Sequence, residues 1–300
     1  MSRAGTTAVE LIVVIVVAGV LSTAIGTLLR RQQRFYTRAA SIVEHRASLR
    51  DATAILPAEL RALSPDGGDV LAFSDSSLEI RATIGAGIVC DIAADRSAID
   101  VAPARPSQPG TLSAFSMTPQ RGDIALLYDP GVPDEPADDR WTAHLVDGVA
   151  AVTDACETSA LVPTELASLP KLRLRFATGT VLSPTTTTGT FVQALRRVRY
   201  RLYRSPTADW YLGYSEWDGA AYSVTQPVSG PFAAYSRRST STGLSFRYFD
   251  AAGVELFAVS DVSRITRVEV VARAVRAGGL STDTEPLRDA QDVAVRLRNR

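Results

Sequence analysis

Residues 3–29 read RAGTTAVELIVVIVVAGVLSTAIGTLL, and this stretch decides how the rest of the chain is organised. From Leu11 to Leu29 no residue is charged, and most side chains are Val, Ile, Leu or Ala. At about 1.5 Å of rise per residue, a helix of this length extends about 28 Å, close to the thickness of the hydrocarbon core of a bilayer. The stretch therefore predicts a membrane-spanning helix.

This helix differs from a cleavable secretory signal. Such a signal carries a longer basic segment before a shorter apolar core, and a small-x-small cleavage site after it. Here the apolar run begins almost at once and continues into polar helical sequence without a turn signal. We expect the apolar helix to be retained.

Glu10 stands at the beginning of the apolar run, where a carboxylate is costly and usually marks function. One interpretation places Glu10 at the level of the lipid headgroups, in contact with water. The other pairs it with a cation of a neighbouring subunit, which would fix the axial register of packed helices.

The same helix carries small residues at four-residue spacing, namely Ala18, Ser22 and Gly26. A small-xxx-small face lets two helix backbones approach closely in a membrane. Together with Glu10, it indicates a helix that packs against other helices.

Gly5, the following residues Thr6–Leu11 and the apolar run resemble the class III signal of type IV prepilins and type II secretion pseudopilins. The resemblance implies that a prepilin peptidase cleaves after Gly5 and that Thr6 becomes the new, N-methylated amino terminus. It also implies that Glu10 pairs with the terminal amine of the adjacent subunit. The sequence departs from the family at Thr6, where phenylalanine is usual. The implied partners are the peptidase, other minor and major pilins or pseudopilins, and the inner membrane.

The charges that flank the helix favour the opposite orientation. Four arginines follow the apolar run and only Arg3 precedes it, so the positive-inside rule would place the carboxy-terminal body in the cytosol. The resemblance implies a single-pass protein of the inner membrane with an extracytoplasmic body, which is extracted into a pilus or pseudopilus. We expect the second orientation. The four arginines are Arg30, Arg31, Arg34 and Arg38.

The sequence predicts an α+β fold in which a long N-terminal helix packs on an antiparallel β-sheet body. We expect a leader at 1–5, a transmembrane and assembly helix at 6–29, an amphipathic helix at 30–64, and a β-rich extracytoplasmic domain at 65–300. Apolar residues recur at helical spacing in the third segment. Pro57 should kink or interrupt this helix, and the turn residues from Ser64 to Gly68 should end it.

Short β-prone runs separated by turn residues fill the chain from Val70 onward. Asp250–Gly253 is typical of a hairpin turn. The runs predicted as strands are 70–73, 78–81, 87–92, 124–128, 141–146, 149–152, 172–176, 198–204, 210–214, 244–249, 265–275 and 293–299.

The order of strand patterns in the carboxy-terminal half is similar to that of the large W-type minor pilins and the J-type minor pseudopilins. These proteins lie at or near the filament tip. Arginines alternate with apolar residues in 172–176 and 198–204, which indicates the solvated face of an antiparallel sheet. An alternative is that these arginines bind an acidic partner or a phosphate.

Cys90 and Cys156 are the only cysteines in the chain. Two cysteines in a chain that leaves the cytosol favour one disulfide, worth about 4 kcal/mol in the chain-entropy model. The alternative is two separate buried thiols.

No enzyme is predicted. The chain has 32 basic and 32 acidic residues, so no net charge points to nucleic acid. It lacks the spacings of nucleophile elbows, phosphate loops and Cys/His zinc sites, and we expect no metal and no cofactor. The acidic loop with Asp134, Glu135, Asp138 and Asp139 lacks EF-hand spacing, so a solvated loop is favoured over a calcium site.

The sequence thus predicts a structural subunit, a minor pilin-like protein that helps to initiate or cap a type IV pilus or a type II secretion filament. The alternative is a single-pass, membrane-anchored extracytoplasmic module for binding or adhesion, which would need neither cleavage nor Glu10.

Overall fold

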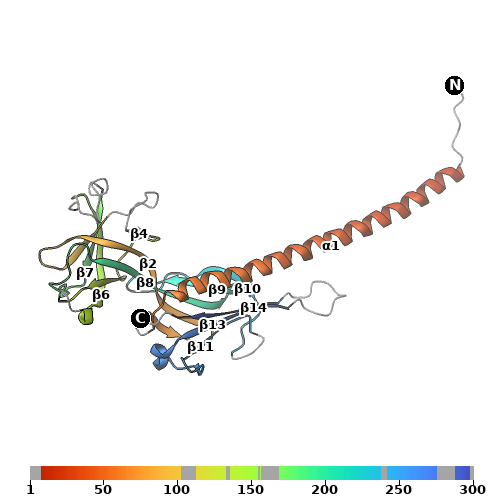
Figure 1. Ribbon diagram of the computed structural model, residues 1–300. Coiled ribbons are helices and arrows are strands. Elements are labelled where there is room, and N and C mark those ends of the chain that lie inside the picture. Colours follow the sequence, from red (N-terminus) through yellow and green to blue (C-terminus); the bar gives the residue numbers. More distant parts are fainter. Residues whose placement is uncertain are drawn as a thin grey trace. The chain divides into compact units, whose positions relative to one another are not determined.

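The structure is a computed structural model that describes residues 8–65, 67–102, 113–132, 136–154, 156, 169–237, 242–275 and 288–297. It shows the predicted α+β fold, with one long N-terminal helix and a body of antiparallel strands (Figure 1). The chain divides into two compact units between Ser48 and Leu49. Gly5 and Thr6 lie outside the described residues.

Helix α1 (Ala8–Arg61) is continuous over 54 residues. Glu10 lies in its first turn, where a carboxylate interacts favourably with the amino-terminal end of a helix. Helical structure continues through Pro57, so the predicted interruption at this residue is wrong. Pro57 removes only one backbone hydrogen bond close to the helix end, while Leu56 and Leu60 on either side are fully buried. Beyond the helix, the carboxylate of Asp69 accepts a hydrogen bond from the Ser64 amide at 2.9 Å.

Six strands of the body form a closed antiparallel barrel (Figure 1). Each strand pairs with the next, and the last pairs back with the first. Around the barrel the strands are β2 (Ser77–Ile92), β3 (Ala98–Val101), β7 (Lys171–Phe176), β6 (Arg140–Val152), β5 (Ile124–Asp129) and β8 (Phe191–Arg204). The two-residue strand β4 (Ala114–Phe115) adds to β2, and the 3-10 helix η1 (Pro136–Asp138) precedes β6.

The barrel has its own apolar core, made of side chains that alternate along the strands. Every strand of the ring contributes to it. The core residues are Val89, Ile99, Val101, Ala125, Leu127, Val146, Leu174, Phe176, Leu182 and Val192.

Strands β2 and β8 continue beyond the barrel into a second layered region. There β1 (Val70–Phe73) pairs with β2, β9 (Trp210–Glu216) pairs with β8, and β10 (Gln226–Phe232) pairs with β9. A separate four-stranded sheet has the order β12 (Glu255–Leu256), β11 (Leu244–Phe249), β13 (Arg267–Val275) and β14 (Arg288–Arg296). The 3-10 helix η2 (Val259–Arg264) connects β12 to β13.

One hydrophobic core joins the end of α1 to both of these sheets. The helix contributes Leu49, Ala52, Leu56 and Leu60, all almost completely buried. The four-stranded sheet contributes the alternate residues of β11 and β13, such as Phe246 and Val270. The carboxy-terminal segment of α1 is therefore an integral part of the body.

Arg196 separates the two cores. On β8, Val192 belongs to the barrel core and Val198 to the second core, and Arg196 lies on the same face between them. Its guanidinium donates two hydrogen bonds to the Asp123 carboxylate, at 3.0 and 2.9 Å, and one to Glu216 at 2.8 Å. Asp123 directly precedes β5, and Glu216 is the last residue of β9. Arg196 on β8 therefore connects two strands that both pair with β8, β5 and β9.

The prediction of two separate strands in the region of β2 is wrong. The predicted strands 78–81 and 87–92 are parts of one strand, β2. This strand continues through a bulge, in which Ile84 is an extra residue between the pairs Thr83–Leu195 and Gly85–Ala194. The Ile84 carbonyl instead accepts hydrogen bonds from Ser116. The glycines in this stretch suggested turns, but in a strand they also accommodate bulges and close contacts.

The predicted strands 141–146 and 149–152 are likewise one strand, β6, with an irregularity between Val146 and Gly148. The predicted hairpin turn at 250–253 is confirmed. Asp250 accepts hydrogen bonds from the Ala252 and Val254 amides at 3.0 and 2.8 Å, and Gly253 adopts a positive φ of 80°.

The arginines that alternate in β7 and β8 have two kinds of surroundings. Arg175 and Arg201 are exposed, as expected for a solvated sheet face. Arg173 pairs with Asp100, while Arg199 pairs with Glu79 and lies 3.7 Å from the centre of the Tyr222 ring. Arg204 is exposed as well, so carboxylates of this chain neutralise two of the five arginines in 172–176 and 198–204.

Replacing Arg196 with leucine should lower the free energy of unfolding by about 3–5 kcal/mol, because Asp123 is 1% exposed and would remain as a buried, unpaired charge. Urea denaturation of the full chain in lipid nanodiscs would measure the change. The double variant R196L/D123L should recover part of the loss, and R121L, at a side chain that is 76% exposed, should change little. Equal stability of R196L and R121L would contradict the role assigned to Arg196.

Candidate functional site

The first part of α1 presents an apolar surface on every side. Thirteen large apolar side chains between Val9 and Leu29 are each more than half exposed, for example Ile15 at 62% and Leu21 at 56%. The most apolar 18-residue window of the segment Ala8–Thr37 has a mean hydropathy of 2.6, and the segment is long and apolar enough to span a membrane.

This surface has to be covered by lipid or by other apolar helices. Full burial of a Val, Leu or Ile side chain is worth roughly 1.5–3 kcal/mol. Covering the exposed halves of thirteen such side chains is therefore worth on the order of 10–20 kcal/mol. We conclude that the segment from Val9 to Leu29 is the part of α1 that contacts an apolar environment.

Glu10 is exposed and lies at the beginning of this apolar segment, in the first turn of the helix. Its position suits either interpretation of the carboxylate, contact with water or a pair with a neighbouring subunit. The interaction with the helix end is common to both.

The small residues predicted as a packing face lie on the same helix. Ala18, Ser22 and Gly26 are each separated by four residues, so they follow one face of α1. Apart from the chain neighbours and the nearby backbone of the helix itself, no atom lies within 4 Å of the position that a Cβ would occupy at Gly19 or Gly26, so the surface there is open. The Thr23 hydroxyl donates to the Gly19 carbonyl, and the Thr27 hydroxyl to the Ala24 carbonyl at 2.8 Å. These bonds satisfy the hydroxyls within the helix.

An aromatic pair follows the apolar segment. Phe35 and Tyr36 are both exposed, and their rings meet edge to face with centroids 6.1 Å apart. They follow Arg30, Arg31 and Arg34. Exposed aromatic residues and arginines after an apolar helix are typical of the level of lipid headgroups.

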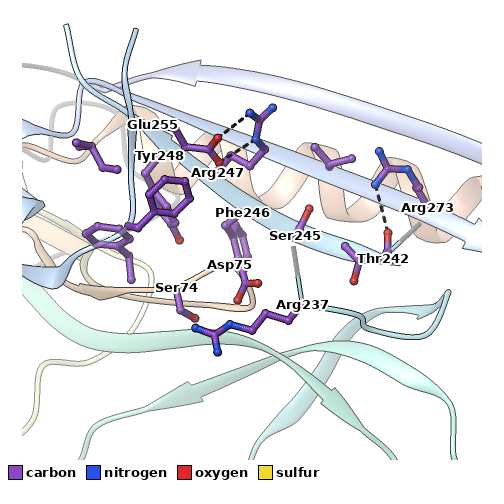
Figure 2. A pocket seen from close by; sticks show the side chains of 14 residues that line it. Ser74, Asp75, Arg237, Thr242, Ser245, Phe246, Arg247, Tyr248, Glu255 and Arg273 are labelled. Carbon is purple, nitrogen blue, oxygen red and sulfur yellow. Dashed lines mark hydrogen bonds and ion pairs between the residues drawn. The ribbon is translucent and has the colours of Figure 1, made fainter. Parts of the chain in front are cut away.

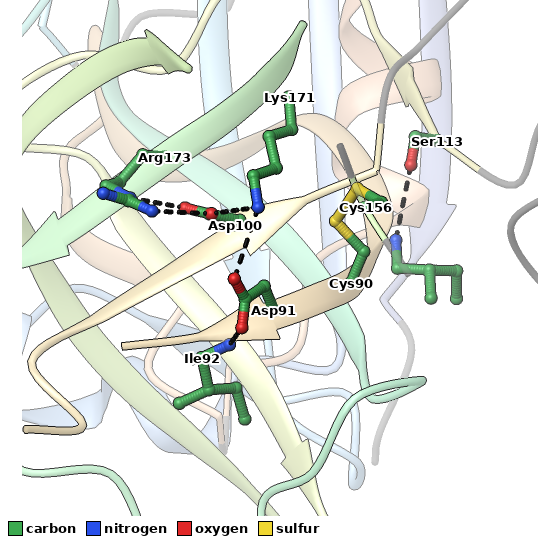
Figure 3. The surroundings of a disulfide bond; sticks show 9 residues. Cys90, Asp91, Ile92, Asp100, Ser113, Cys156, Lys171 and Arg173 are labelled. Carbon is green, nitrogen blue, oxygen red and sulfur yellow. Dashed lines mark hydrogen bonds and ion pairs between the residues drawn. A yellow bond between two sulfur atoms is a disulfide. The ribbon is translucent and has the colours of Figure 1, made fainter. Parts of the chain in front are cut away.

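Cys90 and Cys156 form a disulfide, with Cα atoms 5.5 Å apart (Figure 3). Cys90 is on β2, and both residues are buried in a small cluster with Ala102. The bridge closes a loop over a sequence separation of 66 residues. Disulfides form and persist in oxidising compartments.

An ion cluster built around the buried side chains of Lys171 and Asp100 lies next to the disulfide (Figure 3). Lys171, 2% exposed, donates to Asp100 at 2.8 Å and to Asp91 at 3.3 Å, and Arg173 forms two hydrogen bonds with Asp100 at 2.6 and 2.8 Å. Burial alone would lower the pKa of Lys171, but its carboxylate partners raise the pKa above the ordinary value. Burial alone would raise the pKa of Asp100, but Arg173 and Lys171 lower it. The only lysine in the chain is therefore a structural cation.

The histidines offer no catalytic arrangement within the described residues. The Nε2 atom of His144 lies 2.9 Å from the Thr142 hydroxyl, and the ring packs against Phe176. Burial lowers the pKa of His144, so this side chain is neutral at pH 7. The side chain of His45 lies outside the described residues.

Two residues of the predicted acidic loop are described. The Asp138 carboxylate accepts a hydrogen bond from the Val132 amide at 2.8 Å, and Asp139 accepts one from the Tyr128 hydroxyl at 2.6 Å. Asp134 and Glu135 lie outside the described residues. In the part of the chain that the structure describes, no three His, Cys, Asp or Glu side chains are grouped as metal ligands would be.

The comparisons with known proteins give no relatives. No family model, no curated protein and no solved structure matches the chain.

Replacing both cysteines with serine should lower the free energy of unfolding by about 4 kcal/mol, because the unfolded chain regains the entropy of the open loop. Urea denaturation of the full chain in nanodiscs, without reductant, would measure this loss. Dithiothreitol should destabilise the wild type to the same extent and leave the C90S/C156S variant unchanged. An effect of reductant on the variant would show that the loss has another cause.

Proposed function

We propose that this chain is a minor pilin-like structural subunit that helps to initiate or cap a type IV pilus or a type II secretion-type filament. The observation that carries the proposal is the exposed apolar segment of α1, with Glu10 in its first turn. The resemblance of residues 5–11 to the class III signal adds the processing step. In this proposal the prepilin peptidase cleaves after Gly5, and Thr6 becomes the amino terminus.

The proposal gives α1 two successive environments. Before assembly, lipid covers the apolar segment and the chain is a single-pass protein of the inner membrane. On assembly, helices of neighbouring subunits replace the lipid, and the face with Ala18, Ser22 and Gly26 allows close contact. Glu10 then pairs with the terminal amine of an adjacent subunit and sets the axial register.

The orientation in this proposal has the body outside the cytosol. The disulfide between Cys90 and Cys156 supports this orientation, because cytosolic thiols are kept reduced. The arginines after Leu29 would then lie at the outer headgroups, beside Phe35 and Tyr36. The proposed role is structural, without catalysis, a metal or a cofactor.

Cleavage after Gly5 is the first test of the proposal. When the chain is produced together with a prepilin peptidase, amino-terminal sequencing of the membrane fraction should give Thr6 as the first residue. The G5L variant, with a bulky side chain at the cleavage position, should keep its leader, and G26L should be processed like the wild type. An intact Met1 terminus in the wild type would overturn the proposed processing.

Glu10 should matter for assembly and not for cleavage. In cells that hold the partner pilins, E10Q should reduce the amount of the chain in the sheared filament fraction by about tenfold or more, since loss of a charged partner typically costs at least that factor. The matched control D51N changes an exposed carboxylate of the same helix, in the part that belongs to the body.

Both variants should have the same amino terminus and circular dichroism as the wild type. Normal incorporation of E10Q would rule out the pairing role.

The alternative function is a single-pass, membrane-anchored module for binding or adhesion. Exposed apolar side chains gathered on one short segment of the body, Val254, Phe257 and Val259, favour a binding role for this region. The same two experiments separate the alternatives, because an anchored module needs neither cleavage nor Glu10.

A further inference from the structure

A pocket of about 480 Å³ opens along the edge of β11 in the four-stranded sheet (Figure 2). Strand β12 pairs with β11 only at Tyr248 and Phe249, so the rest of this edge is not covered by a strand. The loop between β1 and β2 takes the place of β12 there, and its Asp75 carbonyl accepts a hydrogen bond from the Phe246 amide at 2.9 Å.

The pocket has an apolar side. Phe73, Phe246, Tyr248 and Leu256 line it and are almost completely buried, and the rings of Phe73 and Tyr248 are in contact with centroids 4.4 Å apart. Phe257, which is 64% exposed, extends the apolar lining to the rim. These side chains would favour an apolar group of a ligand.

Asp75 provides an acceptor that the described residues leave unsatisfied. Its Oδ1 atom accepts a hydrogen bond from the Tyr235 hydroxyl at 2.8 Å, and its Oδ2 atom is buried with no hydrogen-bond partner. Burial raises the pKa of Tyr235, so the phenol stays protonated and keeps Oδ1 occupied. Leaving a buried acceptor without a donor is costly, and a ligand that donates to Oδ2 would remove this cost.

Two arginines of the pocket provide positive charge. Arg247 is already engaged, with hydrogen bonds to Glu255 at 3.0 and 2.9 Å and to Glu269 at 3.3 Å. Arg273 donates to the Thr242 carbonyl at 3.3 Å, and Arg237 is exposed. Neither of these two has an ion pair within the described part of the chain. Figure 2 shows the side chains of Asp75 and Arg237 close to one another, with Arg273 further along the pocket.

We propose that this pocket binds the carboxy-terminal end of a peptide whose last side chain is apolar. The last amide N–H donates to Oδ2 of Asp75, the terminal carboxylate interacts with Arg237 beside it, and the apolar side chain packs against Phe73, Phe246 and Leu256. A simple anion lacks the donor and is repelled by Asp75, whereas a simple cation is repelled by the arginines. The end of a peptide combines an N–H donor, a carboxylate and an apolar side chain. It therefore matches the Asp75 acceptor, the positive charge and the apolar lining of the pocket together.

The inference does not depend on filament assembly. The pocket lies entirely in the body, so binding should be the same for a processed and an unprocessed chain. Failure of the binding experiment would leave the assembly role of α1 untouched, and the converse also holds.

The test uses the full chain in lipid nanodiscs and a hexapeptide, Gly-Ser-Gly-Ser-Ala-Phe, labelled at its amino terminus. Fluorescence anisotropy should give saturable binding for the free carboxylate and binding at least about tenfold weaker for the carboxy-terminal amide. D75N should raise the Kd by about tenfold or more. R121Q changes an exposed arginine outside the pocket lining and should leave the Kd unchanged.

R237Q tests the carboxylate contact with little risk of misfolding, because Arg237 is exposed and no hydrogen bond or ion pair of its side chain is seen among the described residues. It should weaken binding of the acid and leave binding of the amide unchanged, with an unaltered melting temperature.

Three results would overturn the proposal. These are no saturable binding of the acid, equal affinity for acid and amide, and displacement of the peptide by free phenylalanine at equal concentration, which would indicate an amino-acid site.

Discussion

The pairing of β2 with β8 is the contact on which the body depends. These two strands are paired from Ser77–Arg201 to Ile88–Phe191, and this single ladder passes through both the barrel and the second layered region. In the barrel it closes the ring of six strands, and beyond the barrel it forms the centre of the sheet that covers the end of α1. Since every core residue of β2 and β8 is placed by this register, a slip of one residue would turn both cores inside out. The bulge at Ile84 is the one position in this ladder at which the register between the two strands shifts by one residue.

The buried ion pairs lie at the boundaries of the apolar cores and not inside them. Arg196 lies between the two cores with Asp123 and Glu216, and Lys171 lies beside the disulfide with Asp100 and Asp91. Buried charges of this kind add little net stability over apolar side chains, but they penalise any arrangement that separates the partners. In this chain the partners come from different strands, so the pairs favour one particular strand order. The arginines of β8 thus serve the arrangement of strands more than the recognition of a partner.

The chain separates its proposed tasks between two kinds of surface. The apolar segment of α1 is exposed on all sides and needs lipid or other helices, which suits a subunit that moves from a membrane into a filament. The body buries its own cores and, among the described residues, has a pocket that combines the unsatisfied Oδ2 atom of Asp75 with Arg237 and Arg273. Contacts made by the helix would fix the subunit in an assembly, while the pocket would contact whatever reaches the body.

The sequence by itself determined the features that depend on neighbouring residues. The apolar run from Leu11 to Leu29 required a helix in an apolar environment, the alternating runs required strands, and Asp250–Gly253 required a tight turn, because these patterns act over a few residues. Tertiary structure alone decided the closed barrel, the fusion of predicted strands through bulges, and the burial of Arg196 and Lys171. It also formed the pocket, which joins residues as distant as Asp75 and Arg273. These features depend on which strands become neighbours, and a pattern that repeats every two residues does not specify its partner strand.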